Sequence, residues 1–341
     1  MNSITSTTLE GRLQPLMETA GIPGVSMAVL RHGKVDALAA LGVRNTIDNA
    51  PVNIQTVFQA ASLTKPIVAY AALQLVDAGE LTLDGSLAHF VPTVLPGDAA
   101  FAAITARHLL THTCGLPNLR AKNQPLQVHF RPGEWFSYSS VGFNYLQSVM
   151  TAITGEPLEA TMRQLVFDPL GMQSSSLEQS ASFQDNLAAP HEGEAPVDVP
   201  RYPASASFSL HTTAADYGAF LGAVLRGERL KEATHCAWLT CHAHVPKESA
   251  ERLRGQPTET ELDPEVGWGL GWGLEPNHGT FFQWGKMDGT RAFAMGSMAE
   301  QSAVVLLANS NKGLRLMREA AACALPGAHP AIRWLNACVS E

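Results

Sequence analysis

The chain has 341 residues, of which 45% are hydrophobic and 16% charged, and its formal net charge is −8 at pH 7. This length is enough to bury a large core in two domains, or in one domain that carries a large insertion. The acidic balance and the lack of any Lys/Arg-rich run exclude nucleic acid and anionic membrane surfaces as expected partners.

The N-terminal part of the sequence predicts strands and no targeting segment. The first residues have neither a cationic start nor an apolar stretch, and nowhere do about 18 apolar residues run together. We therefore expect a cytoplasmic protein without membrane insertion, or an exported one if a signal peptide was removed. Apolar runs at 24–30 and 35–41 flank an Arg-His-Gly-Lys tetrapeptide, which predicts a β-hairpin.

A Ser-x-x-Lys pattern, made by Ser62 and Lys65, opens an apolar helical segment. Residues three apart share one face of a helix, so the Lys65 ammonium can reach the Ser62 hydroxyl. Pro66 is tolerated only in a first turn, which predicts a helix that begins near Ser62 and leaves the Ser62 backbone N–H unpaired at the positive helix end. Apolar residues at helical spacing continue to Gly79. The pattern proposes a nucleophile and its activator.

The middle of the chain is helical and its last part is extended. Helical periodicity is clearest at 146–153, 158–166 and 214–225, and strand-like runs occupy 281–286, 291–298 and 302–307. The residues at 180–203 include four prolines and few large apolar residues, which predicts a loop or lid.

These elements predict an α/β fold of the α+β type. Its antiparallel sheet is built from both termini and flanked by helices, and an α-rich segment is inserted between the two halves. We expect one domain from 1–60 together with 226–341, and a mainly helical domain at 61–225 that carries Ser62. The active site should lie at their junction, because clefts commonly form between domains.

Five cysteines at irregular spacing indicate reduced thiols rather than a disulfide framework. Two of them, Cys236 and Cys241, lie near His235, His242 and His244 in the sequence. Their spacing matches no usual zinc pattern, so we expect surface or packing roles for these residues. The sequence predicts no metal and no organic cofactor.

Further motifs follow Ser62 and Lys65 in a fixed order. They occupy 62–66, 81–84, 104–117, 132–133, 138–143, 168–172, 267–272 and 285–289. In this order, over roughly 21–312, the chain resembles the class C β-lactamase-like serine hydrolases, a family that also includes D,D-peptidases, D-aminopeptidases and family VIII esterases. The resemblance implies a β-lactamase/transpeptidase-like fold.

The resemblance also implies the members of a catalytic site. Tyr138 would face Ser62 and Lys65, and Ser62 would form an acyl-enzyme. The backbone N–H groups of Ser62 and Gly289 would form the oxyanion hole. Nearby ammonium groups, Lys65 and Lys286, would favour the Tyr138 phenolate near neutral pH. Which member of the Lys65/Tyr138 pair is the base stays open at this point.

Two departures from the family pattern bear on the substrate. Ser140 stands where the Tyr-x-Asn motif carries a side-chain amide, which weakens the expected recognition of a penicillin-type acylamino group. In the Lys/His-x-Gly motif Lys286 fits the first position, but Asp288 replaces the glycine. If Asp288 lies in the cleft it repels substrate carboxylates; the alternative is a paired, structural Asp288 that points into the protein. Ser140, Lys286 and Asp288 are the expected substrate-binding residues.

The sequence therefore predicts a serine hydrolase that cleaves a small ester or amide, with Lys65 and Tyr138 as general base and acid. One alternative is a β-lactamase or a penicillin-binding D,D-peptidase or D-aminopeptidase. Another is a catalytically inactive scaffold of the same fold. His108 and His112 are expected to be structural, and Trp268, Trp272 and Trp284 are expected to pack the sheet and the cleft wall. The predicted partner is a small-molecule ester, amide or β-lactam.

Overall fold

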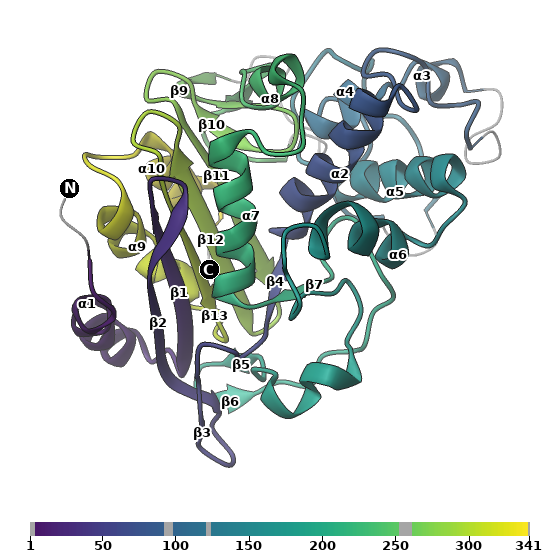
Figure 1. Cartoon of the computed structure of the whole chain (residues 1–341). Helices are drawn as coiled ribbons and strands as arrows, with labels where there is room; N and C mark the ends of the chain where they lie inside the picture. Colours follow the sequence, from purple (N-terminus) through teal and green to yellow (C-terminus); the bar gives the residue numbers. More distant parts are fainter. Residues whose placement is uncertain (1–3, 92–97, 121–123, 252–260, 340–341) are drawn as a thin grey trace.

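The computed structural model describes residues 4–91, 98–120, 124–251 and 261–339, and a nine-stranded antiparallel sheet forms its centre (Figure 1). The strand order is β3-β2-β1-β13-β12-β11-β10-β9-β8. The strands are β1 (Gly24–Arg31), β2 (Lys34–Asn45), β3 (Ala50–Pro51), β8 (Ala243–Pro246), β9 (Leu262–Trp268), β10 (Gly273–Glu275), β11 (Thr280–Met287), β12 (Thr290–Ser297) and β13 (Ser302–Ala308). The predicted fold class, with a sheet made from both ends of the chain, is confirmed.

The two ends of the chain meet at β1, which pairs with β2 on one side and with β13 on the other. Val25 lies opposite Ala308 in this register. The predicted hairpin forms, and its turn places His32 and Gly33 at φ 50° and 68°, which suits glycine and the tetrapeptide found there. The strands β8 to β10 and the first helix were not predicted from the sequence.

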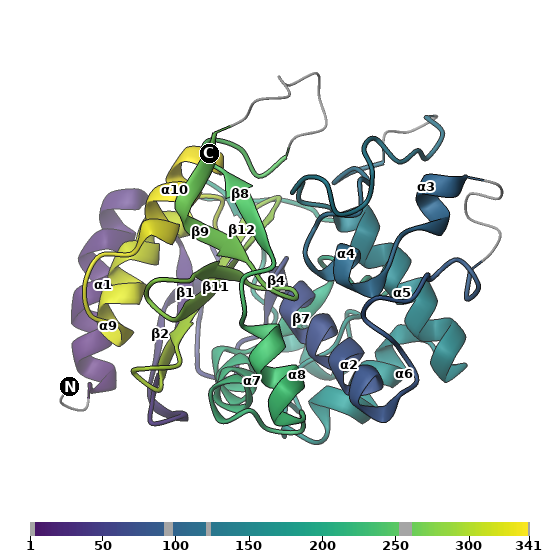
Figure 2. The same ribbon diagram turned by 90° about the horizontal axis from the view of Figure 1, so that it is seen from above.

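Helices cover both faces of the sheet, and the alternation along the strands explains this arrangement. In β13, Val304 and Leu306 face one core, whereas Val305 and Leu307 face the other. The first core lies under α1 (Ser6–Ala20), α9 (Met317–Ala324) and α10 (Pro330–Cys338), which stand together on one side in Figure 2. The helix α7 (Ala214–Arg226) covers β1, β2 and β13 from the other side.

The second core continues beyond α7 into a helical region. This region and the outer loops contain α2 (Thr64–Ala78), α3 (Ala99–Ala102), α4 (Ala106–Leu110), α5 (Ser140–Thr154), α6 (Leu158–Met162), the π-helix η1 (Arg163–Phe167), the 3₁₀ helices η2 (Ala181–Asn186) and η3 (Gly313–Leu316), α8 (Glu232–Trp238), and the short pairs β4 (Phe58–Ala61) with β7 (Leu210–Thr212) and β5 (His191–Glu192) with β6 (Ala195–Pro196). The helix α2 is buried on nearly all sides and ends at Gly79, as predicted.

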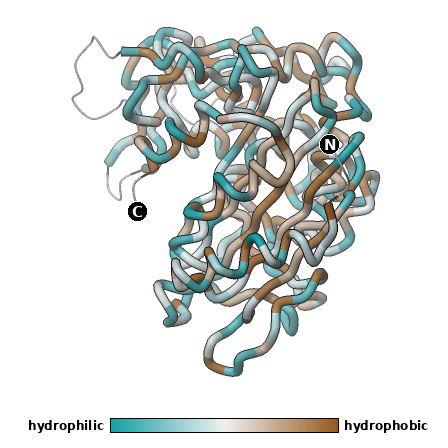
Figure 3. Tube along the Cα trace, turned by 90° about the vertical axis from the view of Figure 1, so that its left-hand side faces the viewer, coloured by the Kyte–Doolittle hydropathy of each residue, from teal (hydrophilic) through white to brown (hydrophobic). Residues whose placement is uncertain are grey.

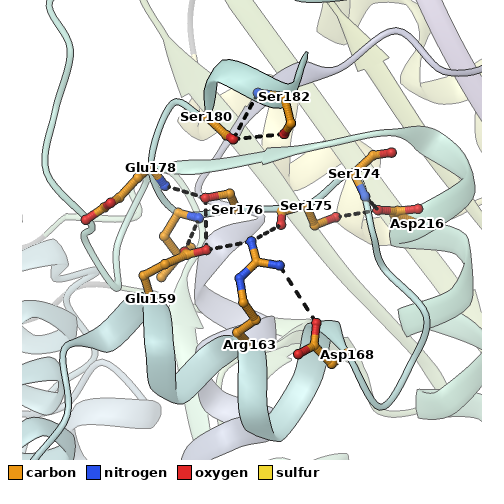
Figure 4. A network of polar contacts seen from close by, with 11 residues as sticks. Glu159, Arg163, Asp168, Ser174, Ser175, Ser176, Glu178, Ser180, Ser182 and Asp216 are labelled. Carbon is orange, nitrogen blue, oxygen red and sulfur yellow. Dashed lines mark hydrogen bonds and ion pairs between the residues drawn. The ribbon is translucent and has the colours of Figure 1, made fainter. Parts of the chain in front are cut away.

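The segment predicted as a loop at 180–203 contains η2 and the small β5–β6 pair. Charged groups anchor the chain just before this segment (Figure 4). Glu159 on α6 accepts hydrogen bonds from the Ser176 hydroxyl at 3.0 Å and the Leu177 backbone N–H at 2.7 Å. Asp216 on α7 accepts from the Ser174 N–H at 2.8 Å and the Ser175 hydroxyl at 2.9 Å. These contacts tie the helical region to the helix that covers the sheet.

The distribution of hydropathy follows the layers. In Figure 3 hydrophobic stretches run along strands in the interior, and hydrophilic stretches gather at the outer loops. Within the described ranges, no helix combines the length and the apolar character that a membrane crossing requires.

Close packing of α7 on the sheet gives a test of the fold. Gly222 is buried in α7, and an added Cβ would lie 2.7 Å from the Gly33 carbonyl oxygen. Gly222→Ala should therefore lower the free energy of unfolding by about 1–3 kcal/mol despite the better helix propensity of alanine. Gly11, inside α1, has no atom within 4 Å of such a Cβ, so Gly11→Ala should raise it by up to about 1 kcal/mol. Urea unfolding of both variants measures these two changes in the free energy of unfolding. Equal changes in the two variants would contradict the packing argument.

Candidate active site

Ser62 follows a strained residue at the end of β4. Ala61 is buried and has φ 46°, a left-handed conformation that is costly for a residue with a Cβ. Two bonds of the Thr64 side chain fix this turn: its hydroxyl donates to the Ala61 carbonyl at 2.6 Å and accepts from the Leu210 N–H at 3.0 Å. The helix α2 begins at Thr64, two residues after the predicted start at Ser62. Ser62 thus lies immediately before the positive end of α2.

Lys65 is buried completely, and its ammonium nitrogen has three hydrogen-bond acceptors from three parts of the chain. They are the Ser62 hydroxyl at 3.1 Å, the Ser140 hydroxyl at 3.2 Å and the Ser207 carbonyl at 2.7 Å. In the described part of the chain no carboxylate forms an ion pair with Lys65. Burial therefore lowers the pKa of Lys65 to about 7. The predicted contact between Ser62 and Lys65 is present in the structure.

Tyr138 packs against the same ammonium, which lies 4.8 Å from the centre of its ring. Burial raises the pKa of the Tyr138 phenol well above its ordinary value, although contacts with the side chains of Ser62 and Gln283 favour the phenolate. This corrects the expectation that neighbouring ammonium groups would favour a phenolate near neutral pH. Desolvation has the largest effect on the Tyr138 pKa, and Lys65 is the member of the pair whose pKa lies near neutrality.

Two histidines flank the site without entering it. His112 is buried, accepts the Ser139 backbone N–H on Nδ1 at 3.0 Å, and packs against Tyr138 with ring centres 4.2 Å apart and ring planes tilted by 32°. Burial holds the pKa of His112 well below its ordinary value, so the ring is neutral. His108 forms a capping box with Thr105 at the start of α4. Both contacts are structural, in line with the sequence interpretation.

Gln283 and Gly285 contribute to the site and were missed in the sequence. The buried Gln283 amide donates to the Tyr138 hydroxyl and to the Ser62 carbonyl, each at 3.1 Å. A Cβ on Gly285 would lie 2.4 Å from the Ala60 carbonyl oxygen, so β11 can approach the turn that carries Ser62 only with glycine there. This close approach favours an x-x-Gly motif from Gln283 to Gly285, three residues before the predicted register. The sequence contains Gln-x-Gly at 283–285, but the sequence interpretation placed the motif at 286–288 because Lys286 matches the positively charged first position.

The remaining predicted residues lie further along the same hairpin. Lys286 and Asp288 are exposed and line the cleft in front of Ser62, so the buried, structural alternative for Asp288 is not what the structure shows. Gly289 is buried at the turn, and its carbonyl accepts the His191 N–H at 2.9 Å. The structure therefore gathers Ser62, Lys65, Tyr138 and Ser140 at one point, with Lys286 and Asp288 on the wall, and places Gly289 behind that wall.

The cleft has a volume of about 720 Å³ and a mixed lining. Its charged groups are Arg120, Glu251, Lys286 and Asp288, two of each sign. Its apolar and aromatic lining includes Leu119, Val141, Tyr202, Phe208, Trp284 and Met287. Trp284 and Tyr202 therefore border the cleft, whereas Trp268 and Trp272 are fully buried in the cores, which confirms the predicted packing role of these two tryptophans. Residues 121–123 of the neighbouring loop lie outside the described residues.

Asn118 is a third residue of the site that the sequence did not reveal. Its Oδ1 accepts from the Ser140 backbone N–H at 3.1 Å and from the Ser140 hydroxyl at 2.8 Å. Its Nδ2 donates to the Glu251 carboxylate at 2.7 Å. These partners come from two segments far from Asn118 in the chain, so no local pattern marks Asn118. It connects the buried lysine, through Ser140, to the rim of the cleft.

The histidines and cysteines near 235–244 make separate contacts. His235 Nε2 lies 2.7 Å from the Val224 carbonyl, and His242 Nε2 lies 2.8 Å from the Ala237 carbonyl. Across the ranges that the structure describes, no group of three or more His, Cys, Asp or Glu side chains is placed to hold a metal ion. All five cysteines are free thiols.

Comparisons with known proteins identify relatives of this chain. Esterase EstB of Burkholderia gladioli is 31% identical over 229 residues, which cover 56% of this chain and 57% of the esterase. Penicillin-binding protein 4 of Amycolatopsis lactamdurans is 28% identical over 286 residues, covering 77% of this chain and 74% of that protein. The chain thus spans little more than half the length of the esterase.

Solved structures show the same fold. A class C β-lactamase superposes with a TM-score of 0.78 at 21% sequence identity, covering 95% of this chain and 97% of that chain. The octameric penicillin-binding protein homologue from Pyrococcus abyssi superposes with a TM-score of 0.76 at 20% identity, covering 93% and 77%. The family model described as Beta-lactamase matches residues 9–325. The resemblance found in the sequence motifs is confirmed, and the chain belongs to the β-lactamase family, whose fold is that of serine hydrolases.

Proposed function

We propose that the protein is a serine hydrolase that cleaves a small, neutral ester through an acyl-enzyme on Ser62. The observation that carries this proposal is the 3.1 Å contact between the Ser62 hydroxyl and the buried Lys65 nitrogen, whose pKa is about 7. A lysine that is uncharged near neutral pH can accept the serine proton, whereas an ordinary lysine cannot.

The chemistry follows from the protonation states of the pair. Uncharged Lys65 removes the Ser62 proton as Oγ forms a bond to the substrate carbonyl carbon and the carbonyl electrons move to its oxygen. When the bond to the alcohol breaks, the departing oxygen takes a proton from Tyr138, which Lys65 then replaces. Water hydrolyses the acyl-enzyme by the same steps in reverse order. The Gln283 amide, which donates to Tyr138, orients its hydroxyl for this role.

The developing oxyanion needs two N–H donors. The first is the Ser62 backbone N–H, ahead of α2. For the second we assign the Lys286 backbone N–H in place of Gly289. Met287 and Thr290 close a two-residue hairpin turn, and such a closing pair exchanges its hydrogen bonds between the two strands. The N–H of Lys286, one residue earlier, is therefore directed away from β12 and toward the edge where Gly285 approaches the nucleophile turn.

Side chains near the nucleophile favour an ester over a β-lactam. Ser140 has no amide for a substrate acylamino group, and the nearby Asn118 amide is engaged on both sides by Ser140 and Glu251. Asp288 lies exposed on the cleft wall, where it disfavours the free carboxylate of a β-lactam or a peptide. A relative named as an esterase supports this choice, and relatives named as a β-lactamase and a penicillin-binding protein define the competing activity.

Covalent labelling of Ser62 tests the proposal. A small fluorophosphonate should add one adduct to the wild-type protein by intact mass and none to Ser62→Ala. The labelling rate should rise about tenfold from pH 6 to pH 8, because the uncharged fraction of Lys65 grows as pH passes its pKa of about 7. Lys65→Met should lower the labelling rate by a factor of about 10² to 10⁴. An unlabelled wild-type protein would support the inactive scaffold instead.

Substrate preference is tested separately with a chromogenic cephalosporin and a p-nitrophenyl ester of a short acid. Wild-type kcat/KM should favour the ester. Ser140→Asn should raise the cephalosporin-to-ester ratio about fivefold, because it supplies an amide worth about 1 kcal/mol in one hydrogen bond. A wild-type protein that prefers the cephalosporin would make β-lactam hydrolysis the function and leave the Ser62 acyl-enzyme in place.

A further inference from the structure

The hydrogen bonds of Lys65 limit how its uncharged form can be arranged. A charged ammonium has three protons, which match its three acceptors, the Ser62 hydroxyl, the Ser140 hydroxyl and the Ser207 carbonyl. After loss of one proton, the nitrogen has two N–H groups and one lone pair. The lone pair needs a donor, and the Ser207 carbonyl cannot be one. Among its described partners only the two serine hydroxyls can donate to it.

The orientation of Asn118 decides between these two hydroxyls. Its Oδ1 must face Ser140, because it accepts the Ser140 backbone N–H at 3.1 Å. Its Nδ2 must face Glu251, because the carboxylate there, 2.7 Å away, can only accept. Two independent contacts thus fix the orientation of the Asn118 side-chain amide. The Ser140 hydroxyl, 2.8 Å from Oδ1, donates its proton to Asn118 and offers Lys65 only a lone pair.

We propose that Asn118 is a positioning residue for the nucleophile: by accepting the Ser140 proton, it leaves Ser62 as the hydroxyl that donates to uncharged Lys65. The two N–H groups of Lys65 then point to Ser140 and Ser207, and its lone pair points along the 3.1 Å line to Ser62 Oγ. That is the arrangement required for transfer of the Ser62 proton. This inference rests on the proposed serine hydrolase function and names what aligns its base.

Removal of the Asn118 amide should move the titration of Lys65 to lower pH. In Asn118→Leu the Ser140 hydroxyl loses its acceptor and turns to the Lys65 lone pair, where it competes with Ser62. This contact exists only with the uncharged amine, so it stabilises that form and moves the Lys65 titration to lower pH. If the substitution instead loosened the packing around Lys65, water would enter, stabilise the ammonium and move the titration to higher pH. The titratable and charged groups that face this region are Tyr138 and His112 on the inside, and Arg120, Glu251, Lys286 and Asp288 along the cleft.

The experiment measures the pH dependence of fluorophosphonate labelling at Ser62. The variants are Asn118→Leu, Glu251→Gln and the double variant Asn118→Asp/Glu251→Gln. Asn118→Leu should lower the plateau rate at high pH about fivefold to tenfold and move the midpoint of the profile to lower pH. Glu251→Gln keeps an acceptor for Asn118 and should stay within about twofold of wild type. The double variant keeps an oxygen for Ser140 and should recover the plateau, with its midpoint at higher pH because the new carboxylate stabilises the ammonium.

A second measurement does not depend on activity. Lysine labelled with ¹³C at Cε reports the titration of Lys65 by NMR, with the signal assigned by its loss in Lys65→Met. The midpoint should fall in Asn118→Leu and rise in the double variant. Unmoved or oppositely moved midpoints would overturn the inference, even if Ser62 is labelled. Midpoints that move as expected in a protein that no fluorophosphonate labels would uphold the hydrogen-bond assignment and overturn the proposed function.

Discussion

Lys65 is buried with no carboxylate partner among the residues that the structure describes, and this is the constraint on which the site depends. An ammonium group removed from water is costly unless its protons are all bound, so three acceptors have to converge on one nitrogen. These acceptors come from the turn before α2, the start of α5 and the loop before β7. The helical region and the strand pair β4–β7 therefore have to meet at this atom. The requirement explains the position of the cleft, whereas burial itself lowers the pKa of Lys65.

Burial shifts the pKa values of the two titratable members of the site in opposite directions. Lys65 and Tyr138 share the same desolvation, but burial favours the neutral form of each, which is a base for the amine and an acid for the phenol. A neutral amide, Gln283, bonds the phenol where a cationic residue would favour the phenolate instead. Burial and the uncharged Gln283 side chain therefore support the proposed roles, with Lys65 as the base and Tyr138 as the acid. The motif alone leaves these two roles open.

Local patterns in the sequence were sufficient for several elements and for the central contact of the site. The hairpin, the helices α2, α5 and α7, the last three strands and the Ser62–Lys65 contact depend on residues close together in the chain, where spacing determines geometry. The register at Gln283 and Gly285 depends on a close approach of β11 to the Ala60 carbonyl, which no local pattern encodes. Asn118 is recognisable only once the segments that carry Ser140 and Glu251 are brought beside it. The helix α1 was missed although Leu9, Leu13 and Met17 recur at helical spacing.

The sheet made from both termini has a consequence for how the chain acquires its structure during synthesis. Val25 pairs with Ala308, so the inner edge of β1 has no strand to bond until almost the whole chain has been translated. At ordinary rates of translation this interval lasts roughly a quarter of a minute to a minute. During it, the β1–β2 hairpin presents an apolar, hydrogen-bonding edge of the kind that promotes aggregation. The strand pairing of the helical region, β4 with β7, is complete once Thr212 has been translated, well before Ala308. This region can therefore form first, and the last strands then close the sheet around an interior that is already ordered.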